Sequence, residues 1–185
     1  IMGFVLNTGY SNTGNGTVLD NSLGVEWKKC TQGQTFRSAT NDCQGTVNAT
    51  YIPVDPQKYG ATPLTYCNVN GFDCNRNSLS LNVTTSSNGV VSEAYTSCVA
   101  DRTAGKSDWR LPTYIELKKL ASGGQNMLTT FFPNTIEDYY WSSWTEENDI
   151  SCKTAKAISF AGTTFGIEKS FNKDTRYYVR CVRTK

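Results

Sequence analysis

Apolar residues recur at helical spacing in two central segments of the chain. Over residues 90–103 they share one face, and Gly105 follows as a natural stop. The second segment begins at Thr113, which forms a capping-box pattern with Glu116 three positions later. Its expected buried stripe, which ends before two glycines, is Leu117, Leu120 and Ala121. The pattern predicts two helices.

The hydrophobic pattern changes to that of strands on both sides of these helices. Before them, residues 7–24 alternate turn formers with short apolar pieces such as 17–19, and residues 25–27 alternate like a half-buried strand. The later strand segments are 139–145, then 157–160 and 164–167 as a hairpin, and 177–182 at the end of the chain. Antiparallel strands around two central helices predict an α+β domain.

Small polar residues dominate the remainder of the chain. The sequence holds 16 Asn, 16 Ser, 24 Thr and 15 Gly in 185 residues, a composition that favours turns and short strands. They are dense over residues 31–89, which show little periodicity. We interpret residues 1–185 as a single domain with a long, loop-rich insertion at about 44–88.

Charge and composition exclude several classes of function. The net charge of +2 is too small for a protein whose main partner is nucleic acid. The chain has no His, which removes His-dependent catalysis and zinc sites with a His ligand. No apolar run approaches the roughly 18 residues of a membrane span. Residues 1–6 are too short for a signal peptide, so we expect that a signal has been removed or that the chain is a fragment.

Seven cysteines without a CxxC motif predict a disulfide framework in an exported protein. Cys30 and Cys43 flank a short loop and can pair locally, as can Cys67 and Cys74 around a turn-rich loop. The residues alone leave the pairing of the other three open, and they are Cys98, Cys152 and Cys181.

Four blocks of the sequence stand out together. They are residues 14–30 (GNGTVLDNSLGVEWKKC), 105–117 (GKSDWRLPTYIEL), 132–134 with 140–143 (FPN and YWSS), and 178–183 (YVRCVR). In this order they resemble the Lcl C-terminal domain family, from about residue 14 to residue 183. The segment from about 44 to 88 does not match the family pattern.

The resemblance implies a C-type-lectin-like fold, related to that of formylglycine-generating enzymes, in an exported bacterial domain such as a surface lipoprotein or adhesin. C-type-lectin-like folds join their first helix to their last strand by a disulfide. The resemblance therefore assigns Cys98 to Cys181 and leaves Cys152 as the free thiol.

Two conspicuous motifs have both a functional and a structural interpretation. Asp108, Trp109 and Arg110 either bind an anion or an aromatic group, or form a structural corner, which we favour. The acidic residues of 146–149 are of the type that binds calcium. The calcium-binding motifs of lectins are not intact there, so we favour a solvated loop and expect no metal and no cofactor.

The end of the chain has the opposite charge. From residue 151 onward there are eight basic residues and two acidic ones. Such a surface suits sulfated glycans, acidic polymers or anionic proteins, unless the charges only mark the solvated side of the strands. The predicted binding surface has two stacking residues, Tyr140 and Trp144, and five cations, which are Lys153, Lys156, Lys169, Lys173 and Arg176. Arg180 and Arg183 are expected to be structural.

The sequence thus predicts a non-catalytic, extracellular, adhesin-like binding domain. Sulfated glycan is the ligand class that the resemblance implies, and a host protein is the other expected partner. The rival hypothesis is a structural or oligomerisation module of a surface lipoprotein. An enzyme is disfavoured because Cys152, the expected free thiol, has no His to activate it.

Overall fold

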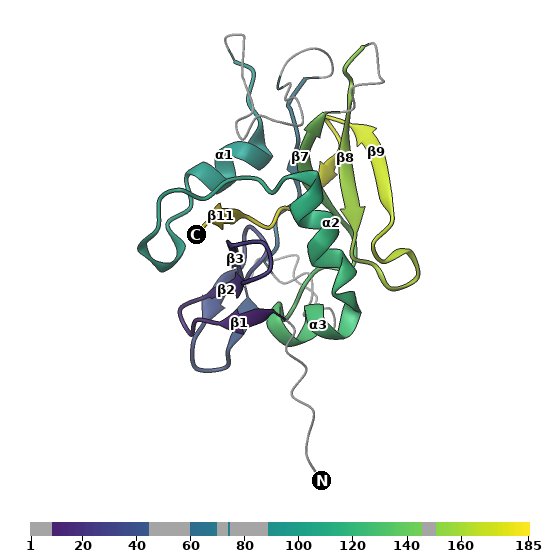
Figure 1. Ribbon diagram of the computed structural model, residues 1–185. Coiled ribbons are helices and arrows are strands. Elements are labelled where there is room, and N and C mark those ends of the chain that lie inside the picture. The colour runs from purple at the N-terminus through teal and green to yellow at the C-terminus, as the bar shows by residue number, and fades with distance from the viewer. Residues whose placement is uncertain (1–8, 45–59, 70–73, 75–88, 146–150) are drawn as a thin grey trace.

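Two antiparallel sheets, two short strand pairs and three helices form the described part of the protein (Figure 1). The computed structural model describes residues 9–44, 60–69, 74, 89–145 and 151–185. The protein is α+β, as the hydrophobic pattern predicts. The arrangement is compatible with the C-type-lectin-like fold that the resemblance implies.

The first sheet brings the beginning and the end of the described chain together. Its strands follow the order β1-β2-β3-β11 and run antiparallel: β1 (Tyr10–Asn12), β2 (Thr17–Asp20), β3 (Val25–Lys28) and β11 (Val182–Thr184). Trp27 is the register partner of Val18 on one side and of Val182 on the other. All three side chains are fully buried, so this sheet packs one face into the core.

The second sheet has three strands in the order β7-β8-β9, which are β7 (Tyr139–Thr145), β8 (Thr154–Ser159) and β9 (Glu168–Asn172). The register between β7 and β8 shifts between Trp141 and Thr145, which indicates a bulge. Two short pairs complete the strands, namely β4 (Thr35–Arg37) with β5 (Asp42–Gln44) and β6 (Leu64–Thr65) with β10 (Arg176–Tyr177).

Three α-helices follow β6 and precede β7 in the sequence: α1 (Glu93–Val99), α2 (Tyr114–Ser122) and α3 (Gly124–Phe131). The predicted capping box is present, because Thr113 accepts from the Glu116 amide and Glu116 accepts from the Thr113 amide. Only two helices were expected. The third forms because Gly124, with a φ of +82°, lets the chain turn and start a new helix immediately.

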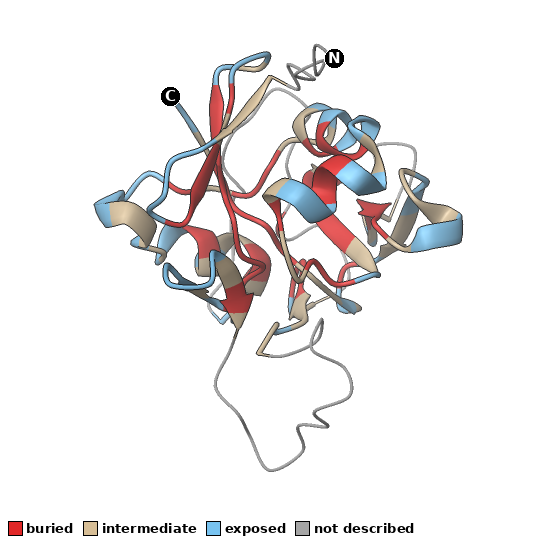
Figure 2. Cartoon of the chain, turned by 90° about the horizontal axis from the view of Figure 1, so that it is seen from below, coloured by how far each residue is buried: buried red, intermediate tan, exposed pale blue. Residues whose placement is uncertain are grey.

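Buried residues are concentrated along strands and helices inside the molecule (Figure 2). The two faces of the second sheet pack into two different hydrophobic clusters. Tyr140 and Ile158 face the cluster that contains α2, α3 and the first sheet. Trp141 and Ala157 face the cluster that contains α1 and two of the disulfides. This alternation follows from the period of two along a strand, and it decides which side chains of the sheet reach the surface.

The three predicted disulfides are confirmed: Cys30–Cys43, Cys67–Cys74 and Cys98–Cys181. The third connects α1 to the residue before β11, across 83 positions of sequence. Cys152 is the free cysteine, as predicted, and it is half-buried.

Two strand predictions near the end of the chain are wrong in detail. Residues 164–167 do not form the second strand of the hairpin, because Gly162–Thr164 is a 3₁₀ turn and β9 begins at Glu168. Residues 177–182 do not form one strand but are divided between β10 and β11. The division occurs where Arg180 turns inward to donate to the backbone carbonyls of Lys28 and Lys29.

Much of the predicted insertion at 44–88 lies outside the described residues, as does the acidic stretch 146–149. The described part contributes β6 and the buried pair Cys67–Cys74. Among the described residues, no helix has the length and apolar character that a membrane span requires.

Candidate functional site

The seven residues predicted to form one binding surface lie in different parts of the second sheet and its surroundings. Tyr140 and Lys173 are in the interior, each with 0% of its surface exposed. Trp144 and Lys156 lie together on the face that α2 covers. Lys169 points to the opposite face, because its register partner is Ala157. A single surface made of all seven is therefore not what the structure shows.

Tyr140 is a core residue, so the prediction that it stacks on a ligand is wrong. Its hydroxyl shares a 2.8 Å hydrogen bond with Thr31 Oγ1 and accepts from the Ile136 amide at 3.0 Å. Its ring packs edge-to-face on Phe160 at 5.0 Å. Complete burial raises the pKa of the Tyr140 hydroxyl. Side chains alternate between the two faces of a strand, and Tyr140 lies on the face of the sheet that α2 covers, where the first hydrophobic cluster buries it.

Lys173 is also structural, and its predicted role in ligand binding is wrong. Its amide donates to the Lys153 carbonyl at 2.8 Å, and its carbonyl accepts from the Cys67 amide at 3.0 Å. Its ammonium lies 5.9 Å from the centre of the buried Tyr66 ring. Lys173 thus ties the end of β9 to the segment around Cys67.

Trp144 and Lys156 are brought together, but the Lys156 ammonium already has an acidic neighbour, Glu168. The Lys156 ammonium lies 5.2 Å from the centre of the Trp144 ring and 5.4 Å from that of Tyr114. Glu168 Oε1 lies 3.6 Å from the same ammonium. Glu168 Oε2 accepts from the Tyr114 hydroxyl and from Lys118. Because Glu168 contacts both Lys156 and Lys118, an anion at the α2 face would have to compete with this carboxylate.

The opposite face carries a half-exposed aromatic cluster with a cation above it, which we call the Lys169 surface: Tyr139, Lys169, Phe171 and Tyr177. The Lys169 ammonium lies 5.0 Å from the centre of the Phe171 ring. Phe171 contacts Tyr177 and Tyr139 with centroid separations of 4.4 and 4.8 Å. Lys169 is exposed and has no acidic partner among the described residues. Burial, and then the nearby Asp138 carboxylate, raise the pKa of the Tyr177 hydroxyl.

The remaining two predicted cations are exposed and lie outside this cluster. Lys153 precedes β8. Arg176, in β10, donates to the Pro63 carbonyl at 3.1 Å and to Glu93 at 3.2 Å. Its side chain is 56% exposed, so this ion pair is weak and open to competition by another anion.

The Asp108-Trp109-Arg110 motif forms the structural corner that we favoured. Asp108 accepts twice from Arg183, at 2.7 and 3.0 Å. Trp109 is 2% exposed and belongs to the second cluster. Arg110 makes a two-pronged pair with Glu116 at 2.7 and 2.8 Å. Both charged side chains therefore hold the loop before α2 in place.

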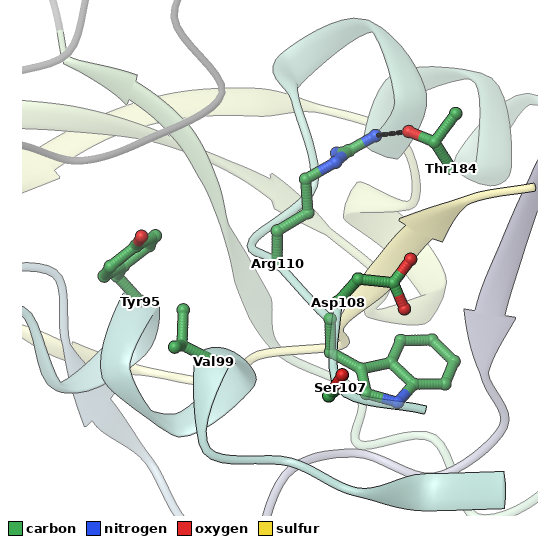
Figure 3. Close-up of a pocket in the computed structure, with 7 residues that line it drawn as sticks. Tyr95, Val99, Ser107, Asp108, Arg110 and Thr184 are labelled. Atoms are coloured by element: carbon green, nitrogen blue, oxygen red, sulfur yellow. Dashed lines mark hydrogen bonds between the residues drawn. The ribbon is translucent and has the colours of Figure 1, made fainter. Parts of the chain in front are cut away.

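A pocket of about 380 Å³ opens beside this corner (Figure 3). One wall is Tyr95 and Val99 of α1, and the other is the loop of the motif together with Thr184 of β11. A second pocket, of about 330 Å³, borders β3. Its cation, Lys28, is directed at Asp101 at 2.5 Å and so already has an anionic partner.

Metal ligands do not gather in the part of the chain that the structure describes. No group of three or more His, Cys, Asp or Glu side chains there could hold a metal ion. The candidate calcium loop at residues 146–149 is outside the described residues, so its interpretation stays a prediction.

Comparison with known proteins gives the family. The model of the Lcl C-terminal domain matches residues 16–183, which is nearly the whole chain. The chain belongs to the Lcl C-terminal domain family. No curated protein sequence matches it significantly.

Membership in the Lcl C-terminal domain family suggests an extracellular, adhesin-like domain. The three disulfides agree with this, and together they indicate an exported protein. The blocks that carry the resemblance form the corner around Arg183 and supply Lys28, Phe132 and Tyr140 around the buried Arg180. These blocks thus account for the fold of the family more than for a ligand.

Sequence reasoning missed the aromatic partners of Lys169 and the α1 wall of the pocket, although it singled out the Asp108-Trp109-Arg110 wall. The contact of Phe171 could have been predicted, because side chains two positions apart in a strand lie on the same face, as Phe171 and Lys169 do. Tyr177 comes from a different sheet and pairs with Leu64, so no local signal indicated it. Val99 and Thr184 meet at the pocket only through tertiary folding, with no pattern in the sequence.

Proposed function

We propose that the protein is a non-catalytic binding domain of the cell surface that recognises sulfated or otherwise anionic glycan through the Lys169 surface. The single observation that carries the proposal is an exposed ammonium on a half-exposed aromatic cluster, with no acidic partner among the described residues. Two further exposed cations lie on the C-terminal strands, namely Lys153 before β8 and Arg176 in β10.

The chemistry of a sulfated sugar fits this surface. A sulfate ester would accept a charge-assisted hydrogen bond from Lys169, while the apolar face of the sugar ring lies on Phe171 or Tyr177. The composition of the chain supports a non-catalytic role. The sequence has no His, the residue that most often activates a Ser or Cys nucleophile.

The test is retention on immobilised heparin with a charge-reversal variant and a matched control. Lys169→Glu should elute at clearly lower salt than the parent protein, because the attraction to sulfate becomes repulsion. Lys119→Glu changes the net charge equally but lies exposed on α2, on the other side of the sheet. It should lower retention only slightly. Equal losses in the two variants, or no retention of the parent protein, would contradict the proposal.

A docking module is the rival function, and one observation favours it. Ile115 on α2 is 70% exposed and Ile167 before β9 is 51% exposed. Ile115 lies about one helical turn before Lys118, and the Lys118 ammonium contacts Gly166 and Glu168, the two neighbours of Ile167 in sequence. Exposed apolar side chains gathered in this way are typical of protein contacts. Light scattering after gel filtration distinguishes the two: a stable oligomer that Ile115→Glu dissociates favours the docking module.

A further inference from the structure

The pocket beside the structural corner combines an apolar wall with a polar one (Figure 3). Val99, at the end of α1, is 40% exposed although it is a large apolar residue, and half-buried Tyr95 lies one helical turn before it. Ser107, Asp108 and Thr184 form the polar side. A concave site with an apolar surface and a few convergent polar groups is the usual form of a small-ligand site.

The charges around this pocket cancel within the protein. Asp108 is paired with Arg183, and Arg110 is paired with Glu116. The hydrogen bonds from Arg183 hold the pKa of the Asp108 carboxyl below its usual value, so this group is an ionised acceptor at neutral pH. An anion in the pocket would meet the Asp108 carboxylate, and a cation would meet the guanidinium of Arg110. The electrostatics therefore favour an uncharged ligand.

The pocket still has hydrogen-bonding capacity after these internal bonds are counted. Each Asp108 oxygen accepts one bond from Arg183, and its side chain is 56% exposed, so each keeps a further lone pair. Thr184 Oγ1 accepts from Arg110 at 3.3 Å, which leaves its own proton to donate. The exposed Ser107 hydroxyl has no partner within the described ranges.

We propose that this pocket binds one neutral saccharide residue, with its apolar ring face on Val99 and Tyr95 and its hydroxyls on Asp108, Ser107 and Thr184. A pyranose is uncharged, has one face made of C–H groups, and carries hydroxyls that both donate and accept. A volume of about 380 Å³ is at the small end of ligand pockets, which suits a single sugar ring. This site goes beyond the proposed function, because it shares no residue with the Lys169 surface and binds an uncharged group.

The test titrates ¹⁵N-labelled protein with four neutral sugars: methyl β-galactopyranoside, methyl β-glucopyranoside, N-acetylglucosamine and fucose. At least one should give saturable amide shifts at residues 95–99 and 107–110, with a Kd in the low millimolar range expected of so small a ligand. The Kd should not change with salt, because no net charge is involved.

Two exposed valines near the ends of α1 provide the matched variants. Val99→Arg places a long side chain in the pocket and should weaken sugar binding at least about tenfold. Val91 is 42% exposed and does not line the pocket, so Val91→Arg should leave sugar binding unchanged. Ser107→Ala removes only an exposed hydroxyl and should weaken binding by about threefold to tenfold. Lys169→Glu should not affect this site even if it abolishes heparin retention.

Several results would overturn the inference. One is the absence of saturable shifts at these amides with all four sugars. Another is binding that persists in Val99→Arg while that variant keeps the parent spectrum elsewhere. A third is a response at these amides to a sulfated heparin disaccharide or to a polyamine in place of the neutral sugars.

Discussion

Arg183 of β11 donates to Glu26 of β3 at 2.6 Å, across the ladder that joins the last strand to the first sheet. The same guanidinium holds Asp108 from the loop before α2. Three of the four blocks that carry the family resemblance thus meet at one side chain. Their shared sequence pattern is explained by this junction, whereas the candidate anion-binding residue, Lys169, lies outside all four blocks.

Removing this guanidinium should destabilise the fold. The Glu26 side chain is 8% exposed, so Arg183→Met leaves a nearly buried carboxylate without its cationic partner and with only the hydrogen bond from Thr17. We expect the free energy of unfolding to fall by about 3 kcal/mol. Urea denaturation at neutral pH measures it, with Lys185→Met as the control because Lys185 is exposed at the end of the chain. Equal losses in both variants would show that the junction is not stabilising.

Stability should fall in acid because of Glu116. Burial alone would raise its pKa, but the hydrogen bonds and charge of Arg110, with those of Thr113, hold the pKa below the ordinary 4.5. The pKa of Asp101 beside Lys28 is also lowered, against the effect of burial. A carboxyl whose pKa is lower in the folded state stabilises the fold above its unfolded pKa, and this contribution disappears as the pH falls through the folded value.

The free energy of unfolding should therefore be steady near neutral pH and decrease below about pH 4.5. Urea denaturation at a series of pH values gives the profile. Glu116→Gln should make the decrease shallower, and Glu137→Gln, at an exposed position, should not. A profile for Glu116→Gln that runs parallel to that of the parent protein would exclude this carboxyl as a cause.

The elements that sequence reasoning placed correctly are those with local signals. Helix α2 begins at Thr113 because the capping box involves residues only three apart. Helix α3 was missed because two successive glycines indicate an end, while the structure uses Gly124 to turn the chain into another helix. The break before β11 depends on Arg180 reaching carbonyls about 150 positions away, which no local pattern contains.

The site was harder to predict than the fold. The run Tyr139–Thr145 has large apolar side chains on both faces, because both faces are covered. Its sequence therefore does not reveal that Trp144 reaches the α2 side while Tyr139 joins the Lys169 surface. The prediction that Lys173 lies on the surface failed for another reason. A lysine is expected to be exposed, and only contacts with Tyr66 and Cys67, which are distant in sequence, explain its burial.

The disulfides should differ in their contribution to stability. Cys98–Cys181 closes a loop of 83 positions and Cys67–Cys74 one of 7. Replacing both cysteines of a pair by Ala should cost roughly 4 kcal/mol for the long loop and roughly 2.5 kcal/mol for the short one, in the chain-entropy model. Melting temperatures of the two double variants give the order. Non-reducing peptide maps should contain the Cys98–Cys181 peptide, and one linking Cys152 to either residue would contradict the pairing.

Calcium is expected to be unnecessary for folding. The candidate loop at residues 146–149 lacks an intact lectin motif, since Asn148-Asp149 has no Trp directly before it. A chelator should therefore leave the melting temperature unchanged, and millimolar calcium should not raise it. An increase of many degrees would indicate tight binding to the folded state and would overturn this expectation.

Lys169 and Lys173 are two positions of the same charge that should respond in opposite ways to charge reversal. Lys173 is fully buried against Tyr66, so Lys173→Glu would place a carboxylate in a site shaped for a cation beside an aromatic face. We expect a loss of about 3 kcal/mol or more in the free energy of unfolding. Lys169 is exposed, so Lys169→Glu should change stability by less than about 0.5 kcal/mol. Thermal denaturation of both variants decides it. If Lys173→Glu folds with parent stability and loses heparin retention, then Lys173 belongs to the binding surface, contrary to the structural role assigned to it here.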